Sequence, residues 1–229
     1  MKAMILAAGR GERMRPLTDH LPKPLLPVAG TPLIGHHLQS LAQSGIRHII
    51  INHAWLGHLI EQQLANGAEY GVEIQYSAEG EKGLETAGGI IKALPLLGDS
   101  PFVVVNGDVF TDFPFLTLNT ERADDILAHL VLVPNPPQHP LGDFGIESET
   151  GLAMAAAETQ FTYSGIGWFR PEFFADIASG PQKLAPYLRQ AMACKQISAE
   201  VYYGEWADIG TPERLAQINE QQRDRDHVG

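Results

Sequence analysis

Short apolar runs alternate with segments of helical periodicity through the first half of this 229-residue chain. Apolar runs of strand length occupy residues 2–9, 46–53, 72–79 and 101–110. Apolar side chains recur at helical spacing in the intervening residues 33–45, 56–67 and 86–98. Parallel strands need a long crossover, usually a helix, to join them. The alternation therefore predicts an α/β fold in which helices cover both faces of a parallel sheet.

The second half of the chain is less regular and predicts a different arrangement of elements. Strands are expected at residues 126–133 and 163–169, a hairpin within 142–158, and helices at 181–194 and 213–229. A chain of this length is sufficient to bury one proper core, so we expect a single domain.

Composition excludes several classes of function. The 27 acidic residues outnumber the 16 basic ones and give a net charge of −11, which disfavours nucleic acid or an anionic membrane as partner. No run approaches the roughly 20 apolar residues of a membrane span. The apolar run at the N-terminus is too short for a signal peptide, so we expect a cytoplasmic protein. Cys194 is the only cysteine, which excludes an intrachain disulfide framework and is expected to be a buried thiol in a helix.

The segment "LAAGRGERMRPLT", Leu6–Thr18, is a glycine-rich turn after the first strand. Met14 occupies the third glycine position of a dinucleotide fingerprint and prolines replace the expected helix, and no Walker A sequence occurs. Arg13 lies in the turn, and Lys23 lies between two prolines on a stiff loop, where we expect it to be exposed to a ligand. Glycine amides and nearby cations bind phosphate, so the segment predicts a phosphate site, with a solvated basic loop as the alternative.

The motif "LAAGRGERMRPLT…PKPLLPVAGTPLI" resembles the signature of the sugar-1-phosphate nucleotidyltransferases. The resemblance continues through "ETAGGI", "NGDVF" and "WADIGTPERL", and so it covers the whole chain. It implies a Rossmann-like, glycosyltransferase-A-like α/β fold with a mixed sheet flanked by helices, in one domain over residues 1–229. Residues 1–110 would form the nucleotide-binding half and residues 111–229 the sugar-binding half.

The resemblance also implies the reaction and its residues. A nucleotidyl group would pass from a nucleoside triphosphate to a sugar 1-phosphate, with Lys23 neutralising the α-phosphate and Arg13 the leaving pyrophosphate. The implied nucleotide-binding residues are Leu6, Ala8, Gly9, Gly11, Glu12, Arg13, Lys23, Thr86 and Gly107. The implied sugar-binding residues are Asn106, Gly145, Glu158 and Tyr163.

Two aspartates are the expected ligands of one Mg²⁺. Asp108 follows a buried strand, at the edge where open α/β sheets place their ligands. The resemblance pairs it with Asp208, which precedes a helix that Thr211 and Pro212 are expected to begin. Magnesium needs only a few carboxylates when nucleotide phosphates and waters complete its shell. Because two carboxylates repel each other without metal, Asp108→Asn or Asp208→Asn should leave the metal-free protein at least as stable.

The chain departs from the family pattern at two places. Ser77 and Glu79 stand near the position where relatives use Gln to recognise uracil or thymine. Thr159 and Gln160 follow Glu158 where many relatives have E-K-P, so the cation that holds the acceptor phosphate is unidentified.

The resemblance is strongest to short bacterial members of the family, and it implies uridylyl transfer from UTP to N-acetylmuramate α-1-phosphate in peptidoglycan recycling. The alternatives are guanylyl transfer to mannose 1-phosphate and thymidylyl or uridylyl transfer to glucose 1-phosphate. A regulatory subunit that binds a nucleotide sugar without turnover is the non-enzyme alternative. The sequence does not indicate an oligomeric state.

Overall fold

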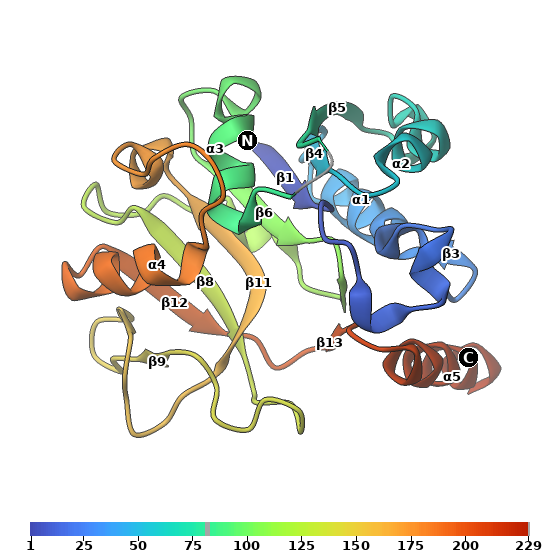
Figure 1. The fold of residues 1–229 in the computed structure, drawn as a ribbon. Helices are drawn as coiled ribbons and strands as arrows, with labels where there is room; N and C mark the ends of the chain where they lie inside the picture. Colours follow the sequence, from blue (N-terminus) through green and yellow to red (C-terminus); the bar gives the residue numbers. More distant parts are fainter. Residues whose placement is uncertain (81–82, 229) are drawn as a thin grey trace.

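A seven-stranded sheet forms the centre of the computed structural model, which describes residues 1–80 and 83–228 (Figure 1). Its strand order is β12-β8-β11-β6-β1-β4-β5. The bounds are β1 Lys2–Leu6, β4 His48–His53, β5 Glu73–Ala78, β6 Phe102–Asn106, β8 Ala128–Val133, β11 Thr162–Phe169 and β12 Ile197–Val201. Strands β6, β1, β4 and β5 run parallel, whereas β11 is antiparallel to both β6 and β8. The mixed sheet confirms the predicted α/β class.

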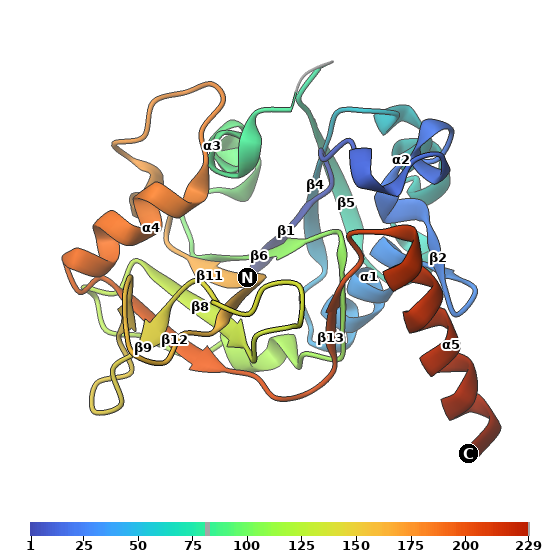
Figure 2. The same cartoon turned by 60° about the horizontal axis from the view of Figure 1, so that its bottom comes forward.

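The side chains of alternate residues in β1 are buried on opposite faces of the sheet. Ala3 and Ile5 pack with the apolar sides of α1 and α2, whereas Met4 packs with α3 and α4. The helices are α1 Leu33–Gln43, α2 Gly57–Leu64, α3 Glu85–Leu97, α4 Leu184–Ala193 and α5 Pro212–Val228. A strand buried on both faces in this way is typical of a parallel sheet between two helical layers, as Figure 2 shows.

Three short antiparallel pairs lie outside the main sheet. They are β2 Pro27–Val28 with β3 Thr31–Pro32, β7 Val109–Thr111 with β13 Trp206–Asp208, and β9 Gly145–Ile146 with β10 Ala153–Met154. Six 3-10 turns complete the fold: Glu12–Met14, Leu17–Asp19, Lys23–Leu25, Ala68–Tyr70, Phe115–Leu118 and Pro171–Phe174. The β9–β10 pair confirms the hairpin expected within residues 142–158.

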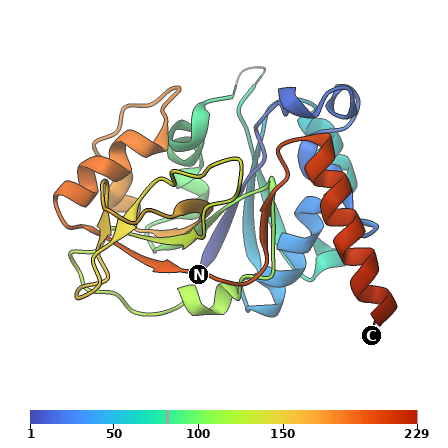
Figure 3. The ribbon, with the colours of Figure 1, turned by 90° about the horizontal axis from the view of Figure 1, so that it is seen from below.

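The last helix packs against the N-terminal loops rather than against the main sheet (Figure 3). Leu215 and Ile218 of α5 share a buried cluster with Met14 and Leu26. The helix begins at Pro212, and the backbone amide of Arg214 donates to the Thr211 hydroxyl. This arrangement confirms the expected start of the helix.

Some local predictions were wrong. The second predicted helix ends at Leu64, because Gly67 takes a left-handed backbone conformation with φ of +83° and turns the chain toward β5. Strand β12 was missed, although Ile197, Ala199 and Val201 alternate with polar residues as expected for an edge strand. Cys194 is exposed, because α4 ends at Ala193 and the cysteine caps it. No helix among the described residues is long and apolar enough to cross a bilayer.

His37 on α1 is a buried histidine with an incomplete set of partners. Its side chain lies edge-on to Phe115, and its Nε2 has no hydrogen-bond partner among the described residues. Burial lowers the pKa of His37 from 6.5 to about 4, although the Val109 backbone and the Asp108 charge act in the opposite direction. The imidazole is therefore neutral in the folded protein at neutral pH.

His37 should make the protein less stable as the pH falls from about 6.5 toward 4. The unfolded histidine binds a proton below its ordinary pKa, whereas the folded one does not, so the unfolded state gains about 3 kcal/mol over this range. Urea unfolding at pH 7 and pH 4.5 should show a smaller pH dependence for His37→Leu than for wild type. The exposed control His20→Gln should retain the wild-type dependence. Parallel curves for wild type and His37→Leu would contradict this account.

Candidate active site

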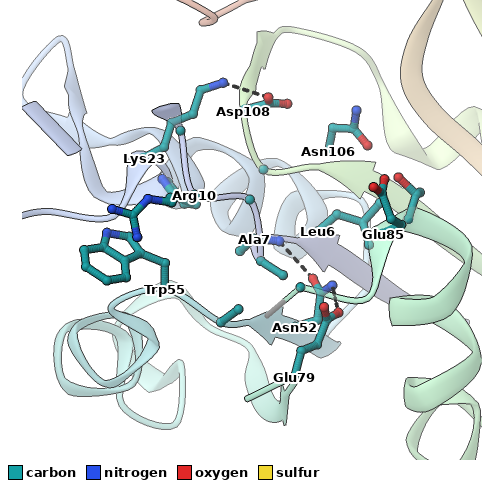
Figure 4. A pocket seen from close by; sticks show the side chains of 18 of the residues that line it. Leu6, Ala7, Arg10, Lys23, Asn52, Trp55, Glu79, Glu85, Asn106 and Asp108 are labelled. Atoms are coloured by element: carbon teal, nitrogen blue, oxygen red, sulfur yellow. Dashed lines mark hydrogen bonds and ion pairs between the residues drawn. The ribbon is translucent and has the colours of Figure 1, made fainter. Parts of the chain in front are cut away.

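A cavity of about 650 Å³ opens at the carboxyl ends of the parallel strands (Figure 4). Leu6, Asn52 and Asn106 stand at one level there, because Leu6 of β1 is in register with the other two. Of the residues predicted from sequence, Leu6, Ala8, Gly9, Gly11, Glu12, Arg13, Lys23, Thr86, Asn106, Gly107 and Asp108 line this cavity. A second cavity of about 330 Å³ shares Arg13, Asn106 and Asp108 with the first and adds Tyr163 and Asp208.

The glycine-rich turn is held from both sides. Gly11 has φ of +70°, and its carbonyl accepts hydrogen bonds from the Met14 amide at 2.9 Å and from the Thr18 hydroxyl at 2.8 Å. Met14, at the third glycine position of the rejected dinucleotide fingerprint, is fully buried in the cluster with α5. The turn is therefore fastened to the C-terminal helix and presents Arg10 to Arg13 to the cavity.

Gly107 allows two strand ends to meet closely. Its amide donates to the Leu6 carbonyl at 2.9 Å, and a Cβ at this position would lie 2.8 Å from that same oxygen. A contact this short excludes any side chain without a backbone shift. The glycine thus brings Asn106 and Asp108 beside the end of β1, at the floor of the cavity.

Lys23 is buried, contrary to the exposure expected from its polar loop. Only 8% of the residue is exposed, and its Nζ donates to Asp108 Oδ2 at 2.7 Å. The prolines at 22 and 24 hold it in a 3-10 turn whose three residues are all buried. The ammonium group nevertheless lines the cavity, so the stem is packed and the charge points toward the ligand space (Figure 4).

Asp208 comes to the same region through the pairing of β13 with β7. Asp208 stands opposite Val109, and the Ile209 amide donates to the Asp108 carbonyl at 2.8 Å. The Asp208 carboxylate accepts a hydrogen bond from Gln138 Nε2 at 2.6 Å and forms an ion pair with Arg214. The structure thus brings Asp108 and Asp208, which are far apart in sequence, to the same cavity.

Each of these carboxylates has its own cation, which changes the stability expectation. Asp108 pairs with Lys23 and Asp208 pairs with Arg214, so the repulsion expected between two unpaired carboxylates is relieved within the protein. Asp108→Asn would leave the buried ammonium of Lys23 without its counterion. The expected gain in metal-free stability is therefore replaced by an expected loss.

The two carboxylates suit a magnesium ion that takes its other ligands from substrate and water. The described residues contain no group of three or more His, Cys, Asp or Glu placed to hold a metal. Magnesium in nucleotide sites commonly uses one or two carboxylates together with phosphate oxygens and waters. The donor set of Asp108 and Asp208 fits that chemistry and does not fit a metal held by protein ligands alone.

Asn52, which the sequence analysis missed, and the Glu79 carboxylate connect three elements at the larger cavity. Asn52 Oδ1 accepts from the Ala7 amide at 2.9 Å, and its Nδ2 donates to Glu79 Oε1 at 2.6 Å. Glu79 Oε2 accepts from the Leu84 amide at 2.6 Å, just before α3. A Cβ on Gly89 of α3 would lie 2.4 Å from Glu79 Oε1, so only glycine leaves room for this carboxylate. The glycine pair in "ETAGGI" was therefore the sequence feature that could have indicated a close contact with α3.

Arg10 and Trp55 form a second pair that sequence reasoning missed. The Arg10 guanidinium carbon lies 4.0 Å from the centroid of the Trp55 ring, and Arg10 Nε lies 2.6 Å from Glu12 Oε1. Both residues line the larger cavity (Figure 4). Stacking on an aromatic ring leaves the in-plane N–H groups of a guanidinium available for an anion.

The residues predicted to bind the sugar are only partly brought together. Asn106 and Tyr163 line the smaller cavity, and burial raises the pKa of the Tyr163 phenol. Gly145 and Glu158 line neither cavity. Gly145 is buried where a Cβ would meet the Ala157 methyl at 2.3 Å, and Glu158 is exposed.

The chain belongs to the nucleotidyl transferase family, because the model described as "Nucleotidyl transferase" matches residues 2–225. It is 53% identical to the N-acetylmuramate alpha-1-phosphate uridylyltransferase of Neisseria meningitidis serogroup B, over 95% of this chain and 96% of that protein. It is 32% identical to the mannose-1-phosphate guanylyltransferase catalytic subunit beta of Danio rerio, over 93% of this chain and 62% of that protein.

A solved structure shares the fold. A Bacillus anthracis protein assigned as a glucose-1-phosphate thymidylyltransferase superposes with a TM-score of 0.85 at 23% identity, covering 98% of this chain and 96% of that chain. The likeness in fold therefore extends over nearly the whole α/β domain.

Asn52→Ala should destabilise the protein through Glu79. The substitution removes a hydrogen bond to a buried carboxylate and leaves the Ala7 amide without its acceptor, which should cost about 3 kcal/mol. Urea unfolding measures the loss. Asn66→Ala is the matched control, because Asn66 accepts one exposed hydrogen bond from the Ala68 amide and should cost less than about 1 kcal/mol. Equal losses in the two variants would contradict the importance of this network.

Proposed function

We propose that this protein transfers a uridylyl group from UTP to N-acetylmuramate α-1-phosphate and releases pyrophosphate. The observation that carries the proposal is the 53% identity with the Neisseria meningitidis uridylyltransferase along nearly the full length of both chains. The cavity that gathers Arg13, Lys23 and Asp108 supports it, because these charges suit a nucleoside triphosphate. UTP as donor places the reaction in the cytoplasm.

The chemistry requires positioning and charge neutralisation. An oxygen of the sugar phosphate attacks the α-phosphorus of UTP in line, and the bond from that phosphorus to the β-phosphate oxygen breaks. The attacking oxygen is already anionic, so no general base is needed. Lys23 would neutralise charge on the α-phosphate and Arg13 on the leaving pyrophosphate. Preorganised cations of this kind lower the barrier because they need not reorient during the reaction.

Asp108 and Asp208 would hold Mg²⁺. The bound ion would neutralise charge on the phosphates of the nucleotide. Lys23 pairs with the Asp108 carboxylate and Arg214 pairs with the Asp208 carboxylate. Binding of the metal to Asp108 would free the ammonium of Lys23 for the α-phosphate, which it could reach because it lines the larger cavity.

The two cavities correspond to donor and acceptor. Residues from Leu6 to Asp108, with Gly210, line the larger cavity, which we assign to UTP. Residues from Asn106 to Arg214, with Arg13, line the smaller one, which we assign to the sugar 1-phosphate. This division supports a nucleotide-binding half up to about residue 110 and a sugar-binding half beyond it. The shared residues Arg13, Asn106 and Asp108 lie where donor and acceptor would meet.

The donor and acceptor can be tested with purified protein. Pyrophosphate release should be fastest with UTP and N-acetylmuramate α-1-phosphate in a panel of UTP, GTP, CTP, ATP and dTTP against N-acetylmuramate, mannose and glucose 1-phosphates. All combinations are compared at equal subsaturating concentrations with Mg²⁺. A higher rate with GTP and mannose 1-phosphate would favour the activity named for the Danio rerio relative. No turnover with any pair would favour a regulatory binding protein.

Lys23→Ala should lower kcat by about 10²–10³-fold, because it removes a preorganised charge at the transferred phosphoryl group. Stability should fall by no more than about 2 kcal/mol, since the partner carboxylate of Asp108 is 43% exposed and can be hydrated. Steady-state kinetics and thermal melts measure the two effects. Lys183→Ala is the control, because Lys183 is exposed and lines neither cavity. Near-normal activity of Lys23→Ala with an unchanged melt would remove Lys23 from the reaction.

A further inference from the structure

We propose that Arg214, together with Arg13, binds the phosphate of the acceptor sugar. This inference rests on the proposed function and supplies the cation that sequence analysis left unidentified. Among the described residues that line the smaller cavity, the cationic or titratable basic side chains are Arg13, Arg214 and His139. His139 Nε2 lies 3.1 Å from the Asp143 carboxylate. The two arginines are therefore the cations that an anion in this cavity would meet.

Arg214 is placed by the first turn of α5. Pro212 begins this helix, and the Arg214 amide donates to the Thr211 hydroxyl that caps it. The Arg214 side chain is 22% exposed, and its Nη1 pairs with the Asp208 carboxylate and lies 3.5 Å from the Asp208 carbonyl. The guanidinium is thus held at the wall of the cavity by the first turn of a helix rather than by a loop.

Gly210 shows that the two arginines converge. A Cβ built on Gly210 would lie 2.7 Å from Arg214 Nη1, 2.9 Å from Asp208 Oδ2 and 3.4 Å from Arg13 Nη2. Two guanidinium groups therefore approach one backbone position, and Arg214 pairs with the Asp208 carboxylate beside it. Arg13 forms no ion pair with the described part of the chain. Because Asp108 is paired with Lys23 and Asp208 with Arg214, the charge of Arg13 is left without a carboxylate partner among the described residues, and an anionic ligand would neutralise it.

Because Gly210 has no side chain, the Arg214 guanidinium and the Asp208 carboxylate can lie beside its backbone. A methyl group there would clash with the Arg214 guanidinium and with Asp208. The glycine lines the larger cavity, whereas Arg214 and Asp208 line the smaller one, so this point lies on the boundary between the two spaces. The acceptor phosphate has to lie at such a boundary, because its oxygen attacks the α-phosphorus of the donor.

Arg214 would exchange partners as the substrates bind. The charge of Arg214 is balanced by the Asp208 carboxylate. If Asp208 binds the metal ion, its carboxylate would no longer pair with Arg214, and the guanidinium would become available to a phosphate. A guanidinium can present two parallel N–H groups to two phosphate oxygens, which a lysine cannot do. Acceptor binding should therefore be stronger with the metal than without it.

The test is steady-state kinetics of Arg214→Gln and Arg214→Lys with the donor and acceptor pair that wild type turns over. KM for the sugar 1-phosphate should rise about 10–100-fold in Arg214→Gln, as expected for loss of a charged hydrogen bond. KM for the nucleotide should stay within about threefold, and Arg214→Lys should recover only part of the loss. Arg223→Gln, an exposed arginine on the same helix, is the matched control and should resemble wild type.

A purely structural role for Arg214 predicts another pattern. If Arg214 only positions Asp208, the Mg²⁺ concentration for half-maximal rate and the nucleotide KM should rise while the acceptor KM stays constant. That result would overturn the proposal. Calorimetric titration of N-acetylmuramate α-1-phosphate into protein with Mg²⁺ gives a readout independent of turnover, and binding should weaken in Arg214→Gln. Turnover with a different substrate pair would overturn the uridylyl assignment alone, whereas equal acceptor affinity in wild type and Arg214→Gln would overturn the role of Arg214 alone.

Discussion

The register of β1 between β4 and β6 sets the level at which the polar groups on the ends of these strands meet. Leu6 is paired with Asn52 on one side and with Asn106 on the other, so three strands end at the same level. The strand itself is buried on both faces and can hardly shift along its axis without exposing apolar residues. The glycine-rich turn, the Asn52–Glu79 contact and the Gly107–Asp108 turn all begin from this common edge.

The protein carries a net charge of −11, yet the site collects cations. Arg10, Lys23 and Arg214 each have an acidic partner within the protein. In the proposed reaction these internal ion pairs would open and the cations would bind phosphate instead. The charges that stabilise the transition state would then be in place before the substrates bind.

The sequence predicted the parts of this molecule that depend on local patterns. Strand and helix alternation gave the parallel half of the sheet, and the motifs around Arg13, Lys23 and Asp108 predicted residues that line one cavity. Burial of Lys23 was missed, because a polar loop gives no sign that distant segments will cover the stem of a lysine side chain. The Asn52–Glu79 network and the Asp208–Arg214 pair were missed for a related reason. Both contacts depend on which strand ends and loops lie next to each other in the folded chain, and local sequence patterns do not predict that arrangement.

Met14 connects the phosphate-binding turn to the last helix of the chain through Leu215 and Ile218. The turn lies early in the chain, and the surface that holds it in place is made by Leu215 and Ile218 of α5. During synthesis, the first strand and its turn leave the ribosome long before α5 exists. The parallel strands can pair in that interval, but Met14 of the phosphate-binding turn does not yet have Leu215 and Ile218 to pack against. The phosphate-binding turn can therefore reach its final packing only after α5 has been synthesised, although the parallel strands that carry it can pair earlier.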